Sequence, residues 1–280
     1  MKTTCSMLNR RAFLRLTLTT GGAAAIMLTG CRPAPSEPQS IGESNEAVDA
    51  NYYISRKAAL LKELNDNFPY FAGVLGKEYD AVAVEAIRRE GQQAFEALIP
   101  QLPYIGGDMN MLTINLIQSA WCLAMYQALQ PRGKTVEDVG RIIYQAVEAM
   151  MNAYPRGFSR LGGIIQMSSL SLEDLKISAE LSHKRLYEGD WVFDVVEGDG
   201  ETFDWGIDYS ECGICKFFQT QEAPELTPYL CLLDFPMSEA TDSGLIRTET
   251  LANGNQQCNF RYKWGRPTEP LLPPGFLEES

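Results

Sequence analysis

Four of the seven cysteines lie in the last third of the sequence, and their spacing is its clearest chemical signal. Cys212 and Cys215 form a Cys-x-x-Cys pair, which is followed by Cys231 and then by Cys258. Thiolates bind metal ions, paired thiols form disulfides, and an activated thiol is a nucleophile. The pattern therefore permits three kinds of site: a metal site held by all four cysteines, two disulfides, or a thiol-centred active site.

Carboxylates accompany two of these cysteines. Glu211 directly precedes Cys212, and Asp208 lies three residues before Glu211. Asp234 follows Cys231 by three residues, a spacing that puts both side chains on one face of a helix. Hydrolysis by a thiol needs a nucleophile and a group that transfers protons. We therefore expect Cys212 to be the nucleophile, Glu211, Asp208 or Asp234 to be the acid or base, and Cys231 to belong to the same catalytic site.

Two arginines follow in the same region. Arg247 or Arg261 could hold a substrate carboxylate through two parallel N–H groups, and Asp208 is a further candidate for substrate binding. Pairing with some of the 36 acidic residues is the alternative role for these arginines. The single histidine, His183, lies in a polar stretch and is expected at the surface. A hydrolytic metal site built from several histidines is therefore excluded.

Hydrophobic periodicity predicts a helical part over residues 47–187. Apolar residues cover most sides of 111–129, which is typical of a buried central helix that ends before Pro131. Thr135 through Asp138 reads as a capping box that starts the next helix, and Ser171 through Asp174 repeats the signal for a helix ending near Tyr187.

The periodicity changes to two after Tyr187, which indicates strands. Alternating aromatic residues, with turns around Gly198-Asp199-Gly200 and Asn253-Gly254-Asn255, predict four strands: Trp191–Val196, Phe203–Tyr209, Leu245–Leu251 and Asn259–Trp264. The expected fold class is α+β, a helical N-terminal part packed on a small, mainly antiparallel sheet with a C-terminal four-cysteine block. One domain over 47–266, with a helical part (47–187) and an α+β part (188–266), would precede a loose Pro-rich tail at 267–280.

Short segments of the four-cysteine block match a known pattern: Asp208-Tyr209, Glu211-Cys212 with Cys215, Pro228-Tyr229-Leu230-Cys231 with Asp234, and Arg247 through Cys258-Asn259-Phe260-Arg261. This series resembles the L-2-amino-thiazoline-4-carboxylic acid hydrolase family, and the likeness continues more weakly to about Asn51. The resemblance implies hydrolytic opening of a thiazoline ring that carries a carboxylate, leading towards cysteine. The ending Gly254…Cys258-x-Phe260 is also similar to the tail of 4-vinyl-reductase-type ligand-binding domains.

The first thirty residues have the pattern of an export signal. Arg10 and Arg11 form a twin-arginine motif, and a mildly apolar run ends in Leu28-Thr29-Gly30-Cys31. This ending resembles a bacterial lipoprotein signal with Cys31 as the acylated first residue. Residues 31–46, rich in Pro, Ser and Glu, would be a flexible linker. We therefore expect an exported protein, attached to the bacterial membrane by an acyl anchor on Cys31, on the periplasmic or outer-surface side.

The charge balance excludes one class of partner. The chain has 24 basic and 36 acidic residues, and the predicted signal contains four of the basic residues and none of the acidic ones. The remaining 20 bases against 36 acids give a net charge of −16 after removal of the signal. Such a surface repels nucleic acid, so no nucleic-acid partner is expected.

The predicted function is hydrolysis of a small cyclic C–N, thiazoline-carboxylate-like substrate at a cysteine and carboxylate site. The alternative is a non-catalytic, lipid-anchored protein that binds a small ligand or a metal in the same place. No cofactor is predicted for the hydrolase, whereas zinc or an iron–sulfur cluster on Cys212, Cys215, Cys231 and Cys258 would accompany the metal alternative.

Overall fold

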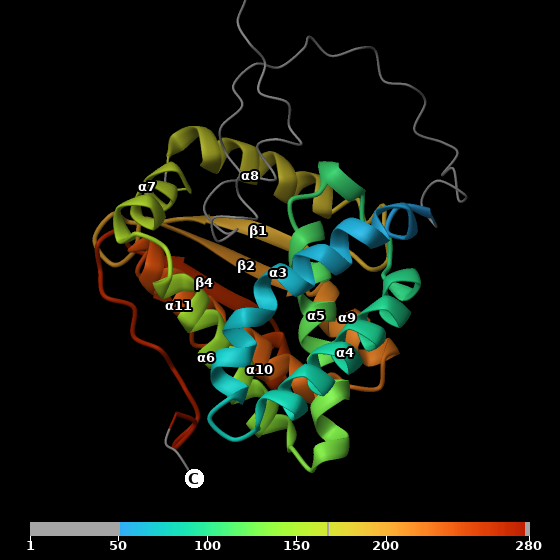
Figure 1. The fold of residues 1–280 in the computed structure, drawn as a ribbon. Coiled ribbons are helices and arrows are strands. Elements are labelled where there is room, and N and C mark those ends of the chain that lie inside the picture. Colours follow the sequence, from blue (N-terminus) through green and yellow to red (C-terminus); the bar gives the residue numbers. More distant parts are fainter. Residues whose placement is uncertain (1–50, 167, 278–280) are drawn as a thin grey trace, which may run out of the picture.

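The computed structural model describes residues 51–166 and 168–277, and in this part of the chain helices precede a four-stranded sheet (Figure 1). The helices are α3 (Lys57–Leu75), α4 (Ala81–Leu98), α5 (Thr113–Leu129), α6 (Val136–Asn152), α7 (Arg156–Gln166), α8 (Ser169–Ser182), α9 (Gly213–Thr220), α10 (Thr227–Cys231) and α11 (Asp234–Thr241). The strands are β1 (Val192–Glu197), β2 (Trp205–Glu211), β3 (Leu245–Ile246) and β4 (Cys258–Tyr262). This arrangement confirms the predicted α+β class.

The helical part is organised around α5, which is buried along most of its length as its apolar sequence predicts. Helix α4 packs against α5, while α3 packs against α4 and α6. The capping box at the start of α6 is confirmed: the Thr135 side chain accepts from the Asp138 N–H, and the Asp138 carboxylate accepts from the Thr135 N–H at 2.9 Å. These two bonds satisfy N–H groups that have no partner inside the helix.

The sheet is antiparallel throughout, with the strand order β1-β2-β4-β3. Phe193, Trp205 and Ile207 are buried on one face, whereas Asp194 on the other face is exposed. Alternate side chains of a strand point to opposite faces. The alternation of aromatic residues that predicts these strands is therefore confirmed for β1 and β2.

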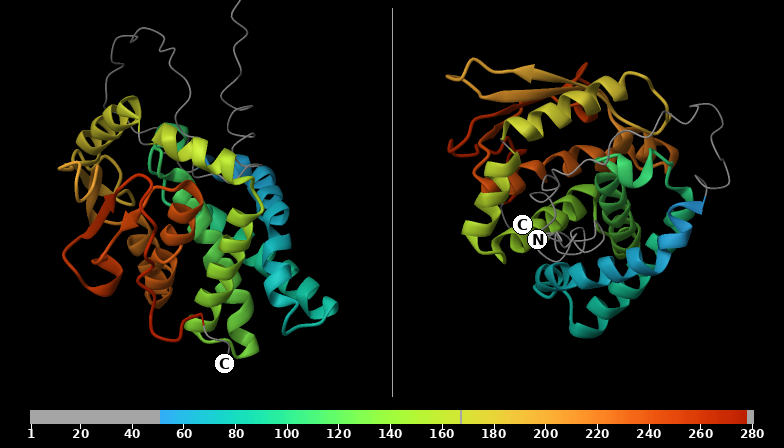
Figure 2. Two further views of the ribbon diagram at one scale, coloured as in Figure 1. Left: turned by 90° about the vertical axis from the view of Figure 1, so that its left-hand side faces the viewer. Right: turned by 90° about the horizontal axis from the view of Figure 1, so that it is seen from above.

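The sheet lies at one side of the molecule and helices α3 to α6 lie at the other (Figure 2). Helix α9 packs against α5, α10 and α11 pack against α6, and α11 also contacts β3. The three short C-terminal helices therefore connect the sheet to the helical part. Helix α8 packs along β1.

Three element boundaries differ by more than two residues from the sequence-based expectation. Helix α8 begins after Ser168, whose hydroxyl accepts from the Ser171 N–H, and it ends at Ser182 rather than near Tyr187. The predicted strand Leu245–Leu251 is reduced to β3, because the side-chain oxygen of Asn259 accepts the N–H groups of the two residues at 248 and 249. These N–H groups are then not available to a ladder with β4.

The C-terminal tail is anchored rather than loose at Phe276. Its side chain is only 1% exposed and packs on Tyr144 and Tyr229, with ring centroids 5.8 and 5.9 Å away. Arg141 donates from Nε to the Phe276 carbonyl oxygen at 2.6 Å. A single large apolar side chain thus fixes a segment whose proline content predicts flexibility.

The predicted signal (1–30), the acylation site Cys31 and the linker (31–46) lie outside the described residues. Among the helices that the structure describes, none is long and apolar enough to cross a membrane.

Candidate functional site

Cys212 occupies the position immediately before the first residue of α9, at the exit of β2. A β-bulge directs its side chain. Phe193 pairs with Tyr209 whereas the adjacent Val192 pairs with Glu211, so Ser210 is an extra residue in β2. An extra residue reverses the alternation of side chains that follow it. Cys212 therefore returns to the face of the sheet that carries Tyr209.

Gly213 lets the start of α9 closely approach the segment that precedes β1. A Cβ atom at this position would lie 2.6 Å from the Trp191 ring and 2.6 Å from the Gly189 carbonyl oxygen. Only glycine fits such a contact. The indole of Trp191 can therefore lie beside the Cys212 thiol.

The surroundings of Cys212 favour its thiolate. Interaction with the Cys215 thiol is the largest influence that lowers the pKa of Cys212, followed by the backbone N–H groups of Cys215 and Ile214 and by the Trp191 side chain. These N–H groups do not reach the geometry of an ordinary capping hydrogen bond. They nevertheless carry the partial positive charge of a helix N-terminus, and together with the Cys215 thiol and Trp191 they outweigh the burial of the sulfur.

The other cysteines of the block hold their protons more firmly. The interaction with Cys212 raises the pKa of Cys215, and burial adds to this effect. Burial raises the pKa of Cys231, and it raises the pKa of Cys258 to about 11 although the Leu251 N–H donates to Cys258 Sγ at 3.2 Å. Cys212 is thus the cysteine of this block that is most easily ionised.

The negative charges of Cys212 and Asp234 affect the pKa of the same three side chains. Burial raises the pKa of Tyr209, Cys231 and Cys258, and negative charges on Cys212 and on Asp234 raise each of the three further. Such charge effects act over a few ångströms. The structure therefore brings Cys212, Cys258 and Asp234 close to Tyr209, with Cys231 and Cys215 in the same group of interacting side chains.

Asp234 begins α11, whereas Cys231 ends α10, so the single helix predicted for these two residues is divided by a turn. The Asp234 side chain is 37% exposed, although protein surrounds it closely enough that burial raises its pKa; Arg247 opposes that rise. Solvent thus reaches the Asp234 carboxylate, although the surrounding protein leaves it poorly hydrated. Such a group is suited to carry a proton between a ligand and water.

The buried side chain of Arg247 pairs with the Asp234 carboxylate. Its side chain is 3% exposed, and the guanidinium lies 5.0 and 5.1 Å from the ring centroids of Phe235 and Phe260. One terminal nitrogen donates to Asp234, and the other donates to the Cys231 carbonyl oxygen at 2.6 Å. Arg247 therefore holds α10, α11 and Asp234 in place and is not presented to solvent.

Asp208 and Arg261 form a pair with each other, with nitrogen-to-oxygen distances of 2.6 and 3.2 Å. Asp208 precedes Tyr209 in β2, so its side chain points to the opposite face of the sheet. The structure consequently separates these two predicted substrate-binding residues from the cysteines. His183 also lies away from the site, exposed and with Nε2 2.9 Å from an Asp194 carboxylate oxygen.

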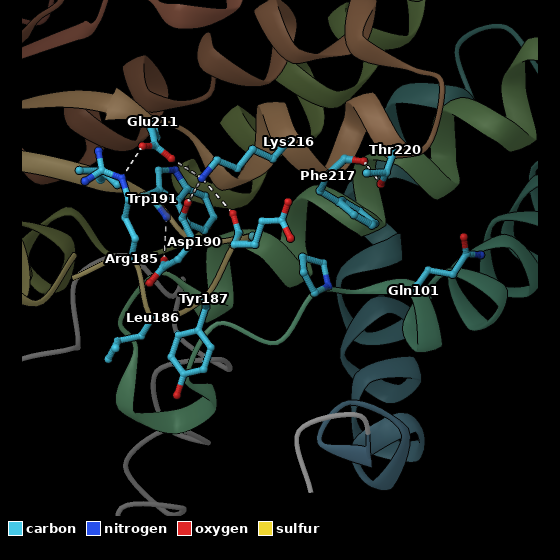
Figure 3. A pocket seen from close by; sticks show the side chains of 14 residues that line it. Gln101, Arg185, Leu186, Tyr187, Asp190, Trp191, Glu211, Lys216, Phe217 and Thr220 are labelled. Carbon is cyan, nitrogen blue, oxygen red and sulfur yellow. Dashed lines mark hydrogen bonds and ion pairs between the residues drawn. The ribbon is translucent and has the colours of Figure 1, made fainter. Parts of the chain in front are cut away.

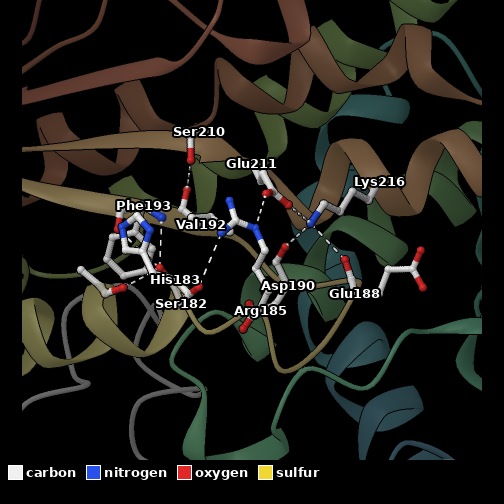
Figure 4. A network of polar contacts seen from close by, with 11 residues as sticks. Ser182, His183, Arg185, Glu188, Asp190, Val192, Phe193, Ser210, Glu211 and Lys216 are labelled. Atoms are coloured by element: carbon white, nitrogen blue, oxygen red, sulfur yellow. Dashed lines mark hydrogen bonds and ion pairs between the residues drawn. The ribbon is translucent and has the colours of Figure 1, made fainter.

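Glu211 lies in a separate pocket of about 890 Å³ (Figure 3). It accepts from Lys216 Nζ at 2.6 Å and from Arg185 Nε at 2.9 Å, and Lys216 also donates to the carbonyl oxygens of Glu188 and Asp190 (Figure 4). Lys216, with help from Arg185, lowers the pKa of Glu211. Glu211 is therefore a fixed anion rather than a proton donor.

Trp191 links the Glu211 pocket to the cysteines, because it lines this pocket and also lowers the pKa of the Cys212 thiol. Sequence patterns identify neither Trp191 nor Tyr209 as a site residue. Tyr209 could have been found from the strand pairing, since it lies opposite Cys258 in the β2–β4 ladder. Trp191 has no comparable signal, because its role depends on the contact with Gly213.

The chemical state of the cysteines separates the three kinds of site. In the described residues Cys122, Cys212, Cys215, Cys231 and Cys258 are unpaired. Within 51–166 and 168–277, no group of three or more His, Cys, Asp or Glu side chains is arranged to hold a metal ion. This geometry does not fit zinc or an iron–sulfur cluster, which need ligands around a common centre. It is consistent with a thiol site.

Comparison with protein families identifies the chain. The model of the family described as L-2-amino-thiazoline-4-carboxylic acid hydrolase matches residues 114–262. The chain belongs to this family. No curated protein and no solved structure matches it.

The family match runs from the start of α5 to the end of β4. It therefore includes α9 to α11 and all four cysteines of the block, and family membership supports a hydrolase at this general level. It does not include α3 and α4, so the weaker likeness expected back to about Asn51 is not part of the match.

The lowered pKa of Cys212 predicts selective alkylation. Only the thiolate reacts, so the rate rises with pH through the pKa, and a lowered pKa moves that rise to lower pH. A thiol whose pKa is about 11, as at Cys258, is only about 0.01% thiolate at pH 7. At neutral pH iodoacetamide should label Cys212 first, as measured by peptide mass spectrometry. Equal labelling of Cys258 at pH 7 would contradict the assignment.

Proposed function

We propose that this protein hydrolyses a small cyclic substrate of the 2-amino-thiazoline-4-carboxylate type, with Cys212 as the nucleophile. The observation that carries the proposal is the half-buried Cys212 thiol at the N-terminus of α9, whose surroundings favour its thiolate. Family membership supplies the reaction class, and an activated thiol is one of the groups that can perform it.

In the proposed reaction, Cys212 Sγ attacks the ring carbon that joins nitrogen and sulfur. The electron pair of one ring bond passes to the departing ring atom, which takes up a proton, and the opened product stays attached to Cys212. Water then attacks the same carbon, and Cys212 leaves as a thiolate. Asp234 would exchange the protons, because its raised pKa and its access to solvent suit both directions of transfer.

The remaining predicted residues have indirect roles in this proposal. Cys231 contributes its carbonyl oxygen to Arg247, which orients Asp234. Arg247 is the one of the three predicted substrate-binding residues that lies at the cysteines, and it acts through Asp234. Asp208 and Arg261 would stabilise the sheet from its other face.

The direct test is turnover by the purified full-length chain. Incubation with 2-amino-thiazoline-4-carboxylic acid should yield a ring-opened product whose mass is greater by one water, detected by mass spectrometry. Absence of this product over a broad pH range, with ligand binding still detected by calorimetry, would instead support the non-catalytic binding role.

The proposal includes the cellular location predicted from residues 1–31. If Leu28 through Cys31 is a lipoprotein signal, Cys31→Ser should abolish acylation, because the residue directly after the cleavage site would then have no thiol to acylate. Acylation is measured by incorporation of a labelled fatty acid and by the mass of the N-terminal peptide. An unmodified wild-type Cys31 would refute the acyl anchor and with it the membrane attachment.

A further inference from the structure

We propose that Cys212 and Cys215 also form a redox-active pair that exchanges with low-molecular-weight disulfides, a chemistry distinct from hydrolysis. The two residues occupy the first turn of α9, on one face, with Cys212 immediately before the helix and Cys215 three residues later. A Cys-x-x-Cys pair at a helix N-terminus is an arrangement used for thiol–disulfide exchange.

Accessibility distinguishes this pair from two of the other described thiols, although not from Cys231, which is also half-buried. Cys212 and Cys215 are half-buried, whereas Cys122 in α5 and Cys258 in β4 are buried. The extended backbone of Cys212, with φ −125° and ψ 120°, lets its side chain turn back over the first turn of the helix. The sulfur of Cys215 then lies within interaction range of the Cys212 sulfur, in line with their mutual influence on ionisation.

The first step uses the more acidic thiol. The Cys212 thiolate attacks one sulfur of a small disulfide, R–S–S–R, forming the mixed disulfide Cys212–S–S–R and releasing R–S⁻. Cys231 and Cys258 lie nearby, but burial raises the pKa of each, and therefore they remain thiols.

The second step follows from the first. Interaction with Cys212 is the largest cause of the raised pKa of Cys215, and formation of the mixed disulfide removes the anionic sulfur responsible. Cys215 then loses its proton to solvent, attacks Cys212 Sγ and releases the second R–S⁻. Two protein thiols are oxidised to one disulfide, and R–S–S–R is reduced to two R–SH after the released anions take up the protons. Cys215 is thus released for reaction only after Cys212 has reacted.

One consequence rests on the proposed function. In the Cys212–Cys215 disulfide the proposed nucleophile is no longer a thiolate, so hydrolysis should fall to background in the oxidised protein and return after reduction. The exchange itself requires no hydrolysis. A protein that exchanges but never turns over the thiazoline would refute the proposed function and leave the redox pair intact.

The test uses the full-length chain, first reduced and then equilibrated in mixtures of reduced and oxidised glutathione. Peptide mass spectrometry should show a Cys212–Cys215 linkage that grows with the oxidised fraction and disappears with dithiothreitol. The variant Cys215→Ser should instead accumulate glutathione on Cys212, because the second step is blocked. Cys122→Ala, which removes a thiol outside the block, should form the same linkage as the wild type.

Two outcomes would overturn the proposal. One is a fully reduced pair under conditions that oxidise free glutathione, and the other is a linkage from Cys212 to Cys231 or Cys258 instead. Circular dichroism of Cys215→Ser and of a second variant, Cys215→Ala, establishes that each is folded. If both variants are folded and neither binds glutathione at Cys212, the first step does not occur.

Discussion

Replacement of Cys212 by serine is expected to reduce the rate of thiazoline-ring opening by at least ~10³-fold. A serine hydroxyl at this position has no comparable anion at neutral pH, because the helix N-terminus and Cys215 favour the thiolate of Cys212 but cannot lower an alcohol pKa far enough. The measurement is the initial rate of product formation by mass spectrometry under saturating substrate.

The matched control for this variant is Cys122→Ala. Cys122 is buried in α5, and burial raises its pKa to about 12, so this thiol has no part in the reaction. The control should retain the wild-type rate, while any loss of stability is followed separately by thermal unfolding. Wild-type turnover in Cys212→Ser would remove the nucleophile assignment.

The second large effect is expected at Arg247. Arg247→Ala should lower the free energy of unfolding by about 3 kcal/mol or more, because it removes a buried partner of a charged pair and leaves the space between two aromatic rings empty. The variant also loses the bond to the Cys231 carbonyl oxygen, which joins α10 to the loop after β3. Urea denaturation followed by tryptophan fluorescence measures the difference.

Arg261→Ala is the matched control, since it removes the same side chain from the other face of the sheet. Arg261 and Asp208 are each about one-quarter exposed, at 24% and 23%, so their pair should contribute only about 1 kcal/mol. If both variants lost the same free energy, the buried cluster around Arg247 would not have the structural role assigned to it.

Much of the fold could be predicted from local patterns. The apolar surface of α5, the capping box at Thr135 and the alternation in β1 and β2 each depend on residues that are close in sequence. The predicted limits of helix α8 and strand β3 are less accurate, because these limits depend on competing hydrogen bonds from Ser168 and from the side chain of Asn259. The tail differs for another reason: the burial of Phe276 requires rings from α6 and α10, which are distant in sequence.

For the site, the sequence alone determined which residue types are present and which classes of chemistry they allow. It predicted Cys212, Cys231 and Asp234 as site residues, and a single histidine excluded a His-rich metal centre. It did not determine which groups face one another. Strict alternation from Tyr209 would have put Glu211 rather than Cys212 on the aromatic face of the sheet.

Only the tertiary structure decided that question, through the extra residue at Ser210 in the pairing of β1 with β2. A bulge is a property of two strands, so no pattern within one of them specifies it. The same holds for ionisation: Cys215, the helix N-terminus and Trp191 lower the pKa of Cys212, while burial raises the pKa of Cys231 and Cys258. Residue type determines that a cysteine can react, but the charges and solvent around its sulfur determine which cysteine does.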